Sequence, residues 1–367
     1  MSLSWGEFNQ KIVSDAVKNR IPVSGTFELT ARCNFQCKMC YICQKGYDAS
    51  IKVRERSSVE WIRMAEEARD AGMFYLLLTG GEVFIRQDFK EIYEELSKMG
   101  FQISIYSNGS LITPDIAKWL GKIPPYKMSV TLYGASPETY YKVTGFAEGF
   151  EKALHGIDNL IAEGIHVGLR TTVVQGNEKE FCKIAELVEK RNLDLGVVNY
   201  IGPRRESGNT DPIGNRLAPE ELVKYEILVD EYNKQKSSKI ESVDDSSENT
   251  RLIDKKADEN TVIQNNAYRC NAGKCIFWIA WDGHMHPCGV FNEPVVYPFE
   301  NGFIESWKEL VDKCNKVPVC KPCLSCEYYN YCIKCPSRIA SETGFFDKPA
   351  PYLCETAKLR YKYKVFI

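Results

Sequence analysis

The sequence lacks the features that would assign it to a membrane or to nucleic acid. Its N-terminal region has no unbroken apolar segment, because Glu7, Asp15 and Lys18 interrupt an amphipathic pattern, so we expect neither a signal peptide nor a membrane span. Neither charge sign is in excess: 47 Lys and Arg stand against 49 Asp and Glu, which leaves a net charge of -2. Such a balance gives no overall attraction to nucleic acid or to an anionic membrane. We expect a cytoplasmic protein with neither as a partner.

Cysteine is nearly absent from the middle of the chain and abundant in two places. Of the 15 cysteines, four lie between residues 33 and 43, ten lie between residues 270 and 354, and Cys182 stands alone. A reducing compartment disfavours disulfides, so metal binding or catalysis is the usual reason for such clusters. The distribution predicts two metal-rich regions separated by a scaffold, in which Cys182 is a buried small apolar residue.

The first group has the spacing Cys33-x3-Cys37-x2-Cys40 and follows the apolar run 24–30 directly. Three thiolates on one short loop can hold three irons of a [4Fe-4S] cube and leave the fourth iron open to a small ligand. The alternatives are a zinc site, for which Cys43 is a candidate fourth ligand, or buried free thiols.

This loop resembles the cluster loop of the radical S-adenosylmethionine (SAM) enzymes, in which the open iron binds the amino and carboxylate groups of SAM. The resemblance implies reductive cleavage of SAM to a 5'-deoxyadenosyl radical, which removes a hydrogen atom from a substrate. It also implies a flavodoxin or ferredoxin-type electron donor.

Short apolar runs alternate with helical patterns between residues 24 and 200, which predicts an α/β fold with a parallel sheet covered by helices. The expected strands are 26–30, 75–79, 102–106, 127–132, 166–173 and 195–200. The expected helices include 5–20, 59–71, 88–98, 150–163, 178–190 and 219–236. Six units resemble the partial (β/α)6 barrel of radical SAM enzymes, with the ligand at the carboxyl ends of the strands.

Motifs at these strand ends match positions that bind SAM in the family. Gly80-Gly81-Glu82 resembles the GGE motif, where the glycines allow a close backbone approach and the carboxylate accepts hydrogen bonds from an ammonium group. Ser107 begins a turn similar to the family's polar-Asn-Gly turn. Thr131 and Arg170 match a hydroxyl on the fourth strand and an arginine on the fifth that bind SAM in the family. For Arg170, a structural ion pair is the alternative. The residues implied to hold SAM are Gly80, Gly81, Glu82, Ser107, Thr131 and Arg170.

The C-terminal cysteines resemble the SPASM extension of radical SAM peptide-modifying enzymes, including the signature Gly283-x4-Cys288. The resemblance implies two auxiliary [4Fe-4S] clusters, and therefore three clusters in all. The implied ligands of the first are Cys270, Cys275, Cys288 and Cys335, and those of the second are Cys323, Cys326, Cys332 and Cys354. The spacing between Cys332 and Cys335 is one residue shorter than usual. A zinc ribbon is the alternative, and His284 and His286 are expected at the surface or in the core rather than as ligands.

The chain divides at a polar stretch rich in Ser, Asp, Glu and Asn, which is typical of a linker. The expected parts are an N-terminal helix (1–23), the partial barrel (24–236), the linker (237–266), the auxiliary-cluster domain (267–355) and a tail (356–367).

The resemblance favours a peptide or protein substrate and a thioether or carbon-carbon cross-link as the product. Sulfatase maturation ranks lower, because maturases carry Asp after the cysteine that matches Cys288, where this chain has Gly289. Epimerisation is the other alternative, with the unassigned Cys43 or Cys320 as hydrogen-atom donor; Cys182 and Cys314 are also unassigned. The chain has no room before residue 24 for a winged-helix recognition domain, which implies a separate recognition protein or a short local dock. A non-enzymatic iron-sulfur or zinc protein is the remaining possibility.

Overall fold

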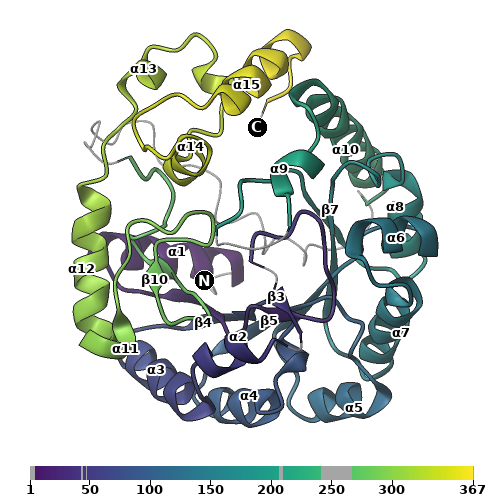
Figure 1. Cartoon of the computed structure of the whole chain (residues 1–367), viewed down its shortest axis with the longest axis vertical. Coiled ribbons are helices and arrows are strands. Elements are labelled where there is room, and N and C mark those ends of the chain that lie inside the picture. Colours follow the sequence, from purple (N-terminus) through teal and green to yellow (C-terminus); the bar gives the residue numbers. More distant parts are fainter. Residues whose placement is uncertain (1–4, 43, 47, 206–209, 241–266, 367) are drawn as a thin grey trace.

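The computed structural model describes residues 5–42, 44–46, 48–205, 210–240 and 267–366 (Figure 1). Cys43 and residues 241–266 of the predicted linker lie outside these ranges. Within them, no helix combines the length and the apolar character that crossing a bilayer requires.

One sheet of eight strands, in the order β10-β9-β1-β4-β5-β6-β7-β8, organises the structure. Its six strands from the first 200 residues are parallel and lie within two residues of the predicted ranges, which confirms the α/β fold with an open partial barrel. They are β1 (Ser24–Glu28), β4 (Tyr75–Thr79), β5 (Gln102–Ser107), β6 (Lys127–Thr131), β7 (Val167–Thr172) and β8 (Leu195–Val198). A separate pair, β2 (Arg32–Cys33) and β3 (Gln44–Lys45), lies in the loop after β1.

Helices cover the convex face of this sheet and form an arc around it in Figure 1. They are α3 (Ser58–Asp70), α4 (Phe89–Ser97), α5 (Pro114–Lys122), α6 (Pro137–Thr144), α7 (Gly149–Ala162), α8 (Phe181–Glu189) and α10 (Pro219–Ile240). Local sequence fixes where they begin: α3 starts at a capping box in which Ser57 and Glu60 satisfy each other's backbone N–H groups. The predicted helix 219–236 extends to Ile240.

The prediction that Cys182 is buried is wrong. The inward stripe of α8 consists of Phe181, Ile184, Ala185 and Val188, and Cys182 is exposed. At one residue from Phe181, Cys182 is rotated by about 100° around the helix and points away from the sheet.

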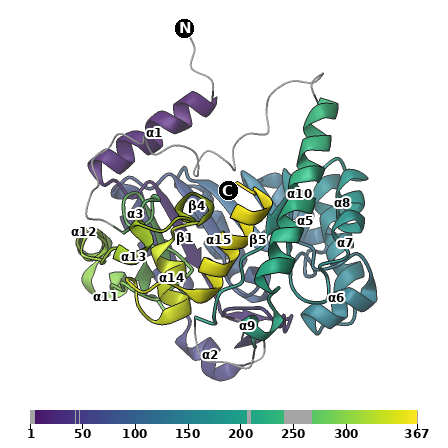
Figure 2. The ribbon, with the colours of Figure 1, turned by 90° about the horizontal axis from the view of Figure 1, so that it is seen from above.

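The cysteine-rich C-terminal region begins as an extension of the barrel sheet. β9 (Ile276–Ile279) pairs in parallel with β1, and β10 (Met285–His286) pairs with β9 in the antiparallel sense. The helices that follow are α11 (Pro298–Asn301), α12 (Phe303–Asn315), α13 (Lys321–Leu324), α14 (Pro336–Thr343) and α15 (Pro351–Tyr363). Figures 1 and 2 both place α15 beside α10, so the end of the chain returns to the last helix of the barrel. The remaining α-helices of the described residues are α1 (Trp5–Asn19), α2 (Ala49–Arg54) and α9 (Pro212–Asn215), and two short 3-10 helices are η1 (Val83–Ile85) and η3 (Tyr329–Tyr331).

Candidate active site

The predicted cluster loop is anchored against α6 at the carboxyl end of the sheet. Two backbone bonds hold it: Gln36 N–H donates to the carbonyl of Thr144 (2.7 Å), and Lys38 N–H donates to the carbonyl of Val143 (3.1 Å). The buried ring of Phe35 lies among Tyr133, Tyr140 and Phe146, with ring centroids 5.3–6.4 Å apart. This aromatic packing fixes the loop on which the three cysteines stand.

The three cysteines of this loop lie within electrostatic reach of one another. Cys33 and Cys37 are buried and Cys40 is half-buried. The pKa of Cys37 is raised well above its ordinary value, first by burial and then by the charges of Cys33 and Cys40, which places all three sulfurs within electrostatic reach of one another. Tyr133, just beyond the end of β6, lies beside Cys37 and slightly offsets this effect through a hydrogen bond. Three thiolates on one loop can hold three irons of a cubane. That these three do so stays a prediction, since no group of three His, Cys, Asp or Glu side chains among the described residues is arranged to hold a metal ion.

The two glycines of the Gly80-Gly81-Glu82 motif are required by a close approach of chain to chain. Gly81 N–H donates to the carbonyl of Thr30 (2.7 Å), and Glu82 N–H donates to the carbonyl of Arg32 (2.9 Å). A Cβ atom at Gly80 would lie 2.5 Å from the carbonyl oxygen of Thr30, and one at Gly81 would collide with that of Arg32. The motif after β4 is therefore docked on the start of the cluster loop.

Glu82 is completely buried at the centre of this arrangement. Its carboxylate accepts hydrogen bonds from Ser107 Oγ (2.9 and 3.0 Å), Asn108 N–H (2.7 Å) and Phe84 N–H (3.2 Å). Burial raises the pKa of Glu82 to about 7 despite these donors, and no cationic side chain among the described residues pairs with the carboxylate. A carboxylate held ready without its own cation is suited to receive one from a ligand.

Asn108 is a site residue that the sequence reasoning missed. Its side-chain amide donates to Asn34 Oδ1 (2.9 Å) and lies 3.7 Å from Cys33 Sγ, while its backbone N–H binds Glu82. It thus connects the GGE motif to the cluster loop. The polar-Asn-Gly turn after β5 was visible in the sequence, but the direction of the amide follows only from the fold.

Thr131 and Arg170 lie side by side on β6 and β7, as expected of residues that share a ligand. The guanidinium of Arg170 stacks 4.4 Å above the ring of Tyr106, which faces the barrel interior from β5. Among the described residues no carboxylate pairs with Arg170. The alternative role for Arg170, a structural ion pair, therefore lacks an acidic partner in this part of the chain.

A buried ion pair inside the barrel also escaped the sequence reasoning. Arg205 Nη2 donates to both carboxylate oxygens of Glu28 (2.8 and 2.7 Å), and Trp278 Nε1 donates to the same group (2.7 Å). Both charged side chains are at most 1% exposed. Because these residues come from β1, the loop after β8, and β9, the pair joins the C-terminal region to the barrel.

Beside Arg205 lies a cavity of about 220 Å³ at the edge formed by β9 and β10. Asn292, in the lining of the cavity, contacts Arg205, since its Nδ2 donates to the carbonyl of Arg205 (2.9 Å). The backbone N–H of Arg205 in turn donates to the carbonyl of Tyr41, next to Cys40. Within the described part of the chain, Asn292 Oδ1 and the Nδ1 atom of buried His286 have no hydrogen-bond partner. The cavity is lined by Ala280, Asp282, His284, His286, Asn292, Glu293, Val295 and Tyr297. His284 is half-buried and His286 is buried.

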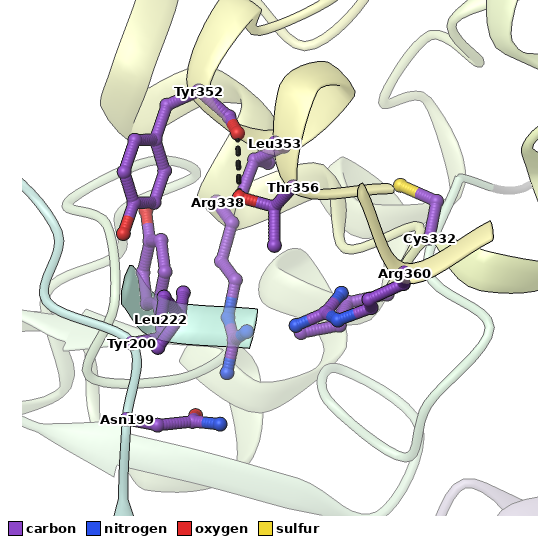
Figure 3. A pocket seen from close by; sticks show the side chains of 10 residues that line it. Asn199, Tyr200, Leu222, Cys332, Arg338, Tyr352, Leu353, Thr356 and Arg360 are labelled. Carbon is purple, nitrogen blue, oxygen red and sulfur yellow. Dashed lines mark hydrogen bonds between the residues drawn. The ribbon is translucent and has the colours of Figure 1, made fainter. Parts of the chain in front are cut away.

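The C-terminal cysteines form two groups. Burial and then the charges of Cys332 and Cys326 raise the pKa of Cys354, and Cys323 Sγ lies 2.7 Å from Cys320 Sγ, so five thiols gather near α13 and α15. A cavity of only about 10 Å³ adjoins this group where Tyr200, at the end of the barrel, stacks with Arg338 (Figure 3). The other group surrounds Tyr268 and includes Cys270, Cys288, Cys314 and Cys335.

Comparison with known proteins gives a family match over part of the chain and similar folds. Residues 27–188 match the radical SAM superfamily, which implies SAM and a [4Fe-4S] cluster. The sequence is 27% identical to the AdoMet-dependent heme synthase of Methanosarcina barkeri, over 89% of this chain and 94% of that protein. It is 26% identical to the Fe-coproporphyrin III synthase of the same organism, over 96% of this chain and 94% of that protein. The fold is similar to Streptococcus suis SuiB bound to S-adenosylmethionine (TM-score 0.68, 16% identity, 96% of this chain and 83% of that one). It is equally similar to anSMEcpe with bound AdoMet (TM-score 0.68, 17% identity, 93% and 96%).

Proposed function

We propose that this protein is a radical SAM enzyme that oxidises a peptide substrate. Its residues 27–188 form the domain of that superfamily. The observation that carries the proposal is the position of the buried carboxylate of Glu82 beside the loop of Cys33, Cys37 and Cys40: Asn108 binds Glu82 through its backbone N–H and lies 3.7 Å from Cys33 Sγ. When bound, the cluster and SAM would supply a 5'-deoxyadenosyl radical that abstracts hydrogen from the substrate.

The chain's own residues would hold and orient SAM. Glu82, fixed by Ser107 and Asn108, would accept hydrogen bonds from the ammonium group. Arg170, stacked on Tyr106, would pair with the carboxylate, and Thr131 beside it would bind a hydroxyl of the ribose. The close packing of Gly80 and Gly81 on the loop would keep these groups in register with the cysteines.

Two observations support a peptide. Related folds have been solved with peptides, namely SuiB with its precursor peptide SuiA and anSMEcpe with the Cp18Cys peptide. The cavity beside Arg205 presents hydrogen-bond acceptors, including Asn292 Oδ1 and the carboxylates of Asp282 and Glu293, which suit the N–H groups of a peptide. A cross-link is the expected product, because two auxiliary clusters would accept the second electron of a net two-electron oxidation.

Sulfatase maturation fits this chain less well than a cross-link. At the position where maturases carry Asp, a Cβ atom on Gly289 would lie 2.9 Å from the ring of Trp278. A carboxylate there would have to displace the indole that hydrogen-bonds to Glu28.

An iron porphyrin is the second candidate substrate. It is favoured by the two Methanosarcina barkeri relatives, which this chain matches over 94% of their length and whose names state porphyrin products. Against it, Asp282 and Glu293 would repel the carboxylates of a coproporphyrin. The peptide therefore remains the leading candidate.

The test uses anaerobically reconstituted full-length protein with SAM and dithionite. The proposal expects 5'-deoxyadenosine, stimulated by a peptide encoded near the gene, and a peptide product lighter by two hydrogens. A product of unchanged formula that has gained one deuterium from deuterated water would indicate epimerisation instead. Consumption of Fe-coproporphyrin III with no effect of any peptide would replace the peptide by the porphyrin. The flavodoxin or ferredoxin-type donor, a separate recognition protein and a cytoplasmic location stay predictions.

A further inference from the structure

The cavity at the edge formed by β9 and β10 combines hydrogen-bond acceptors with an apolar wall. Asp282 and Glu293 contribute carboxylates, and Ala280 and Val295 contribute hydrocarbon. Its volume of about 220 Å³ is several times the share of about 30 Å³ that one water molecule takes in the liquid. The cavity is therefore large enough to hold a side chain of a ligand.

Two buried polar atoms in this lining have no hydrogen-bond partner among the described residues. One is Nδ1 of His286, a residue that is only 2% exposed; a neutral imidazole presents an acceptor there in its Nε2–H tautomer. The other is Oδ1 of Asn292, whose orientation is fixed because Nδ2 of the same amide donates to the carbonyl of Arg205 (2.9 Å). A buried acceptor without a donor is costly, so both atoms are suited to receive N–H groups from a ligand.

The carboxylates of the lining have little positive charge against them. Asp282 lies 3.2 Å from Nδ1 of His284, which is charged only when protonated, and accepts from the backbone N–H of the same residue (3.3 Å). No basic side chain among the described residues pairs with Glu293. The ring of Tyr297, 5.1 Å from that of His284, adds an aromatic surface of the kind that attracts cations.

Two basic side chains near the cavity are already paired with other carboxylates. The guanidinium of Arg205 donates to both carboxylate oxygens of Glu28 (2.8 and 2.7 Å). Lys313 donates to the carbonyl of Val295 (2.8 Å) and forms an ion pair with Glu309 (2.8 Å). Neither cation is therefore available to neutralise the carboxylates of the lining.

We propose that this cavity binds an arginine side chain of the peptide substrate. A guanidinium presents five N–H donors in a planar fork, which suits several acceptors that surround it, and its aliphatic stem would lie along the apolar wall. The acceptors are those of Asp282, His286, Asn292 and Glu293. The inference rests on the peptide of the proposed function and names the part of it that the cavity recognises.

The position of the cavity fits a substrate site. Arg205 is the one residue between the cavity and the predicted cluster loop: its carbonyl is bound by Asn292, and its backbone N–H donates to the carbonyl of Tyr41 (3.2 Å), next to Cys40. An arginine held in the cavity would thus anchor the peptide beside the loop.

The test measures binding of small probes, so it does not depend on turnover. Nα-acetyl-arginine amide, Nα-acetyl-lysine amide and the neutral Nα-acetyl-citrulline amide are titrated by calorimetry into reconstituted full-length protein at pH 8, with SAM and without reductant. We expect the arginine amide to bind about tenfold more tightly than the citrulline amide, which has nearly the same shape but no charge, and more tightly than the lysine amide.

Variants of the lining show where the probe binds. Asp282→Asn combined with Glu293→Gln keeps the shape of the cavity and should weaken the arginine amide about tenfold, with little effect on the citrulline amide. His286→Phe removes Nδ1 and should weaken the arginine amide about three- to tenfold. The matched control is Glu305→Gln with Asp312→Asn, which changes the net charge equally at exposed ion pairs on α12 and should keep the wild-type affinity. Circular dichroism shows whether each variant is folded.

The assignment is overturned if wild type binds the arginine and citrulline amides equally, if it prefers the lysine amide, or if the control loses as much affinity as the acidic pair. Unchanged affinity in the folded lining variants would overturn it too. Failure here is distinct from failure of the proposed function. An oxidised peptide with no binding of the arginine amide would refute only the arginine site, whereas the expected binding pattern with no peptide oxidised would support the site and refute the peptide oxidation.

Discussion

The two cysteine-rich regions of this molecule are built in opposite ways. At the barrel mouth, three thiols stand on a single loop whose backbone is held by α6. In the C-terminal region, each thiol group draws on several elements that are far apart in sequence, as Cys270 and Cys335 are. Spacing along the chain therefore determines the membership of the first group, whereas packing of helices against the sheet determines that of the others.

The first prediction removes the local group. Cys33→Ala, Cys37→Ala or Cys40→Ala should each abolish reductive formation of 5'-deoxyadenosine, because each removes a thiolate that holds the cube. Cys182→Ala is the matched control, since that cysteine is exposed on α8 and should leave the reaction unchanged. 5'-Deoxyadenosine is measured by chromatography after addition of dithionite. Persistent formation in all three variants would remove this loop from the mechanism.

The second prediction separates the two regions by function. Cys288→Ala should lower iron by about four per chain and prevent product formation, yet leave cleavage of SAM measurable, because under the proposed function the C-terminal clusters would only accept the second electron. Iron content and the ratio of 5'-deoxyadenosine to modified peptide are the measurements. If the amounts of product and of 5'-deoxyadenosine fall together in a folded variant, SAM cleavage depends on the C-terminal region as well, and this prediction is wrong.

The third prediction concerns the junction between the regions. Arg205→Met leaves Glu28 charged and uncompensated, which should lower the free energy of unfolding by about 3–5 kcal/mol. Arg191→Met is the control, because the ion pair of Arg191 with Asp158 is partly exposed and should contribute about 0–1 kcal/mol. Denaturant unfolding of both variants gives the comparison. Equal losses would mean that the buried pair does not tie the C-terminal region to the barrel.

The sequence predicted the architecture well because its signals are local. Alternation of apolar runs and amphipathic segments located all six barrel strands, and the cluster loop and GGE motif were read from contiguous residues. What the sequence missed depends on contacts between distant segments. Asn108 acquires its role by reaching Asn34, and Glu28 acquires its role from Arg205 and Trp278.

The junction between the two regions was beyond sequence reasoning for a similar reason. The strand β9 is only four residues long and lies in a segment dominated by cysteine spacing, so its pairing with β1 had no periodic signal. For Cys182 the error came from residue type. Cysteine is usually buried, which led to the prediction of burial, but Cys182 lies on the outer face of α8 and is exposed.

The last prediction has the smallest effect and tests the pH dependence of the barrel mouth. In the folded protein the pKa of Glu82 is about 7, above its ordinary value of 4.5. Without SAM, the carboxyl of Glu82 therefore stays protonated over a pH range in which the same carboxyl is ionised in the unfolded chain. The stability linked to it is therefore fully present below about pH 4.5 and is lost as pH rises through 7. Glu82→Gln should consequently raise the melting temperature of SAM-free protein relative to wild type at pH 8, with little difference at pH 5.

SAM binding should show the opposite trend, because the ammonium group requires the ionised carboxylate. The affinity of wild type should increase roughly tenfold between pH 6 and pH 8, as the ionised fraction of a group with a pKa of about 7 rises. Glu82→Gln should bind SAM more weakly at pH 8 and lose this increase, while its cluster absorbance stays unchanged. Thr113→Val, which removes the N-cap of α5, is a control that should keep the wild-type pH dependence. An identical pH profile in Glu82→Gln would mean that the buried carboxylate holds the Ser107 turn in place and does not bind SAM.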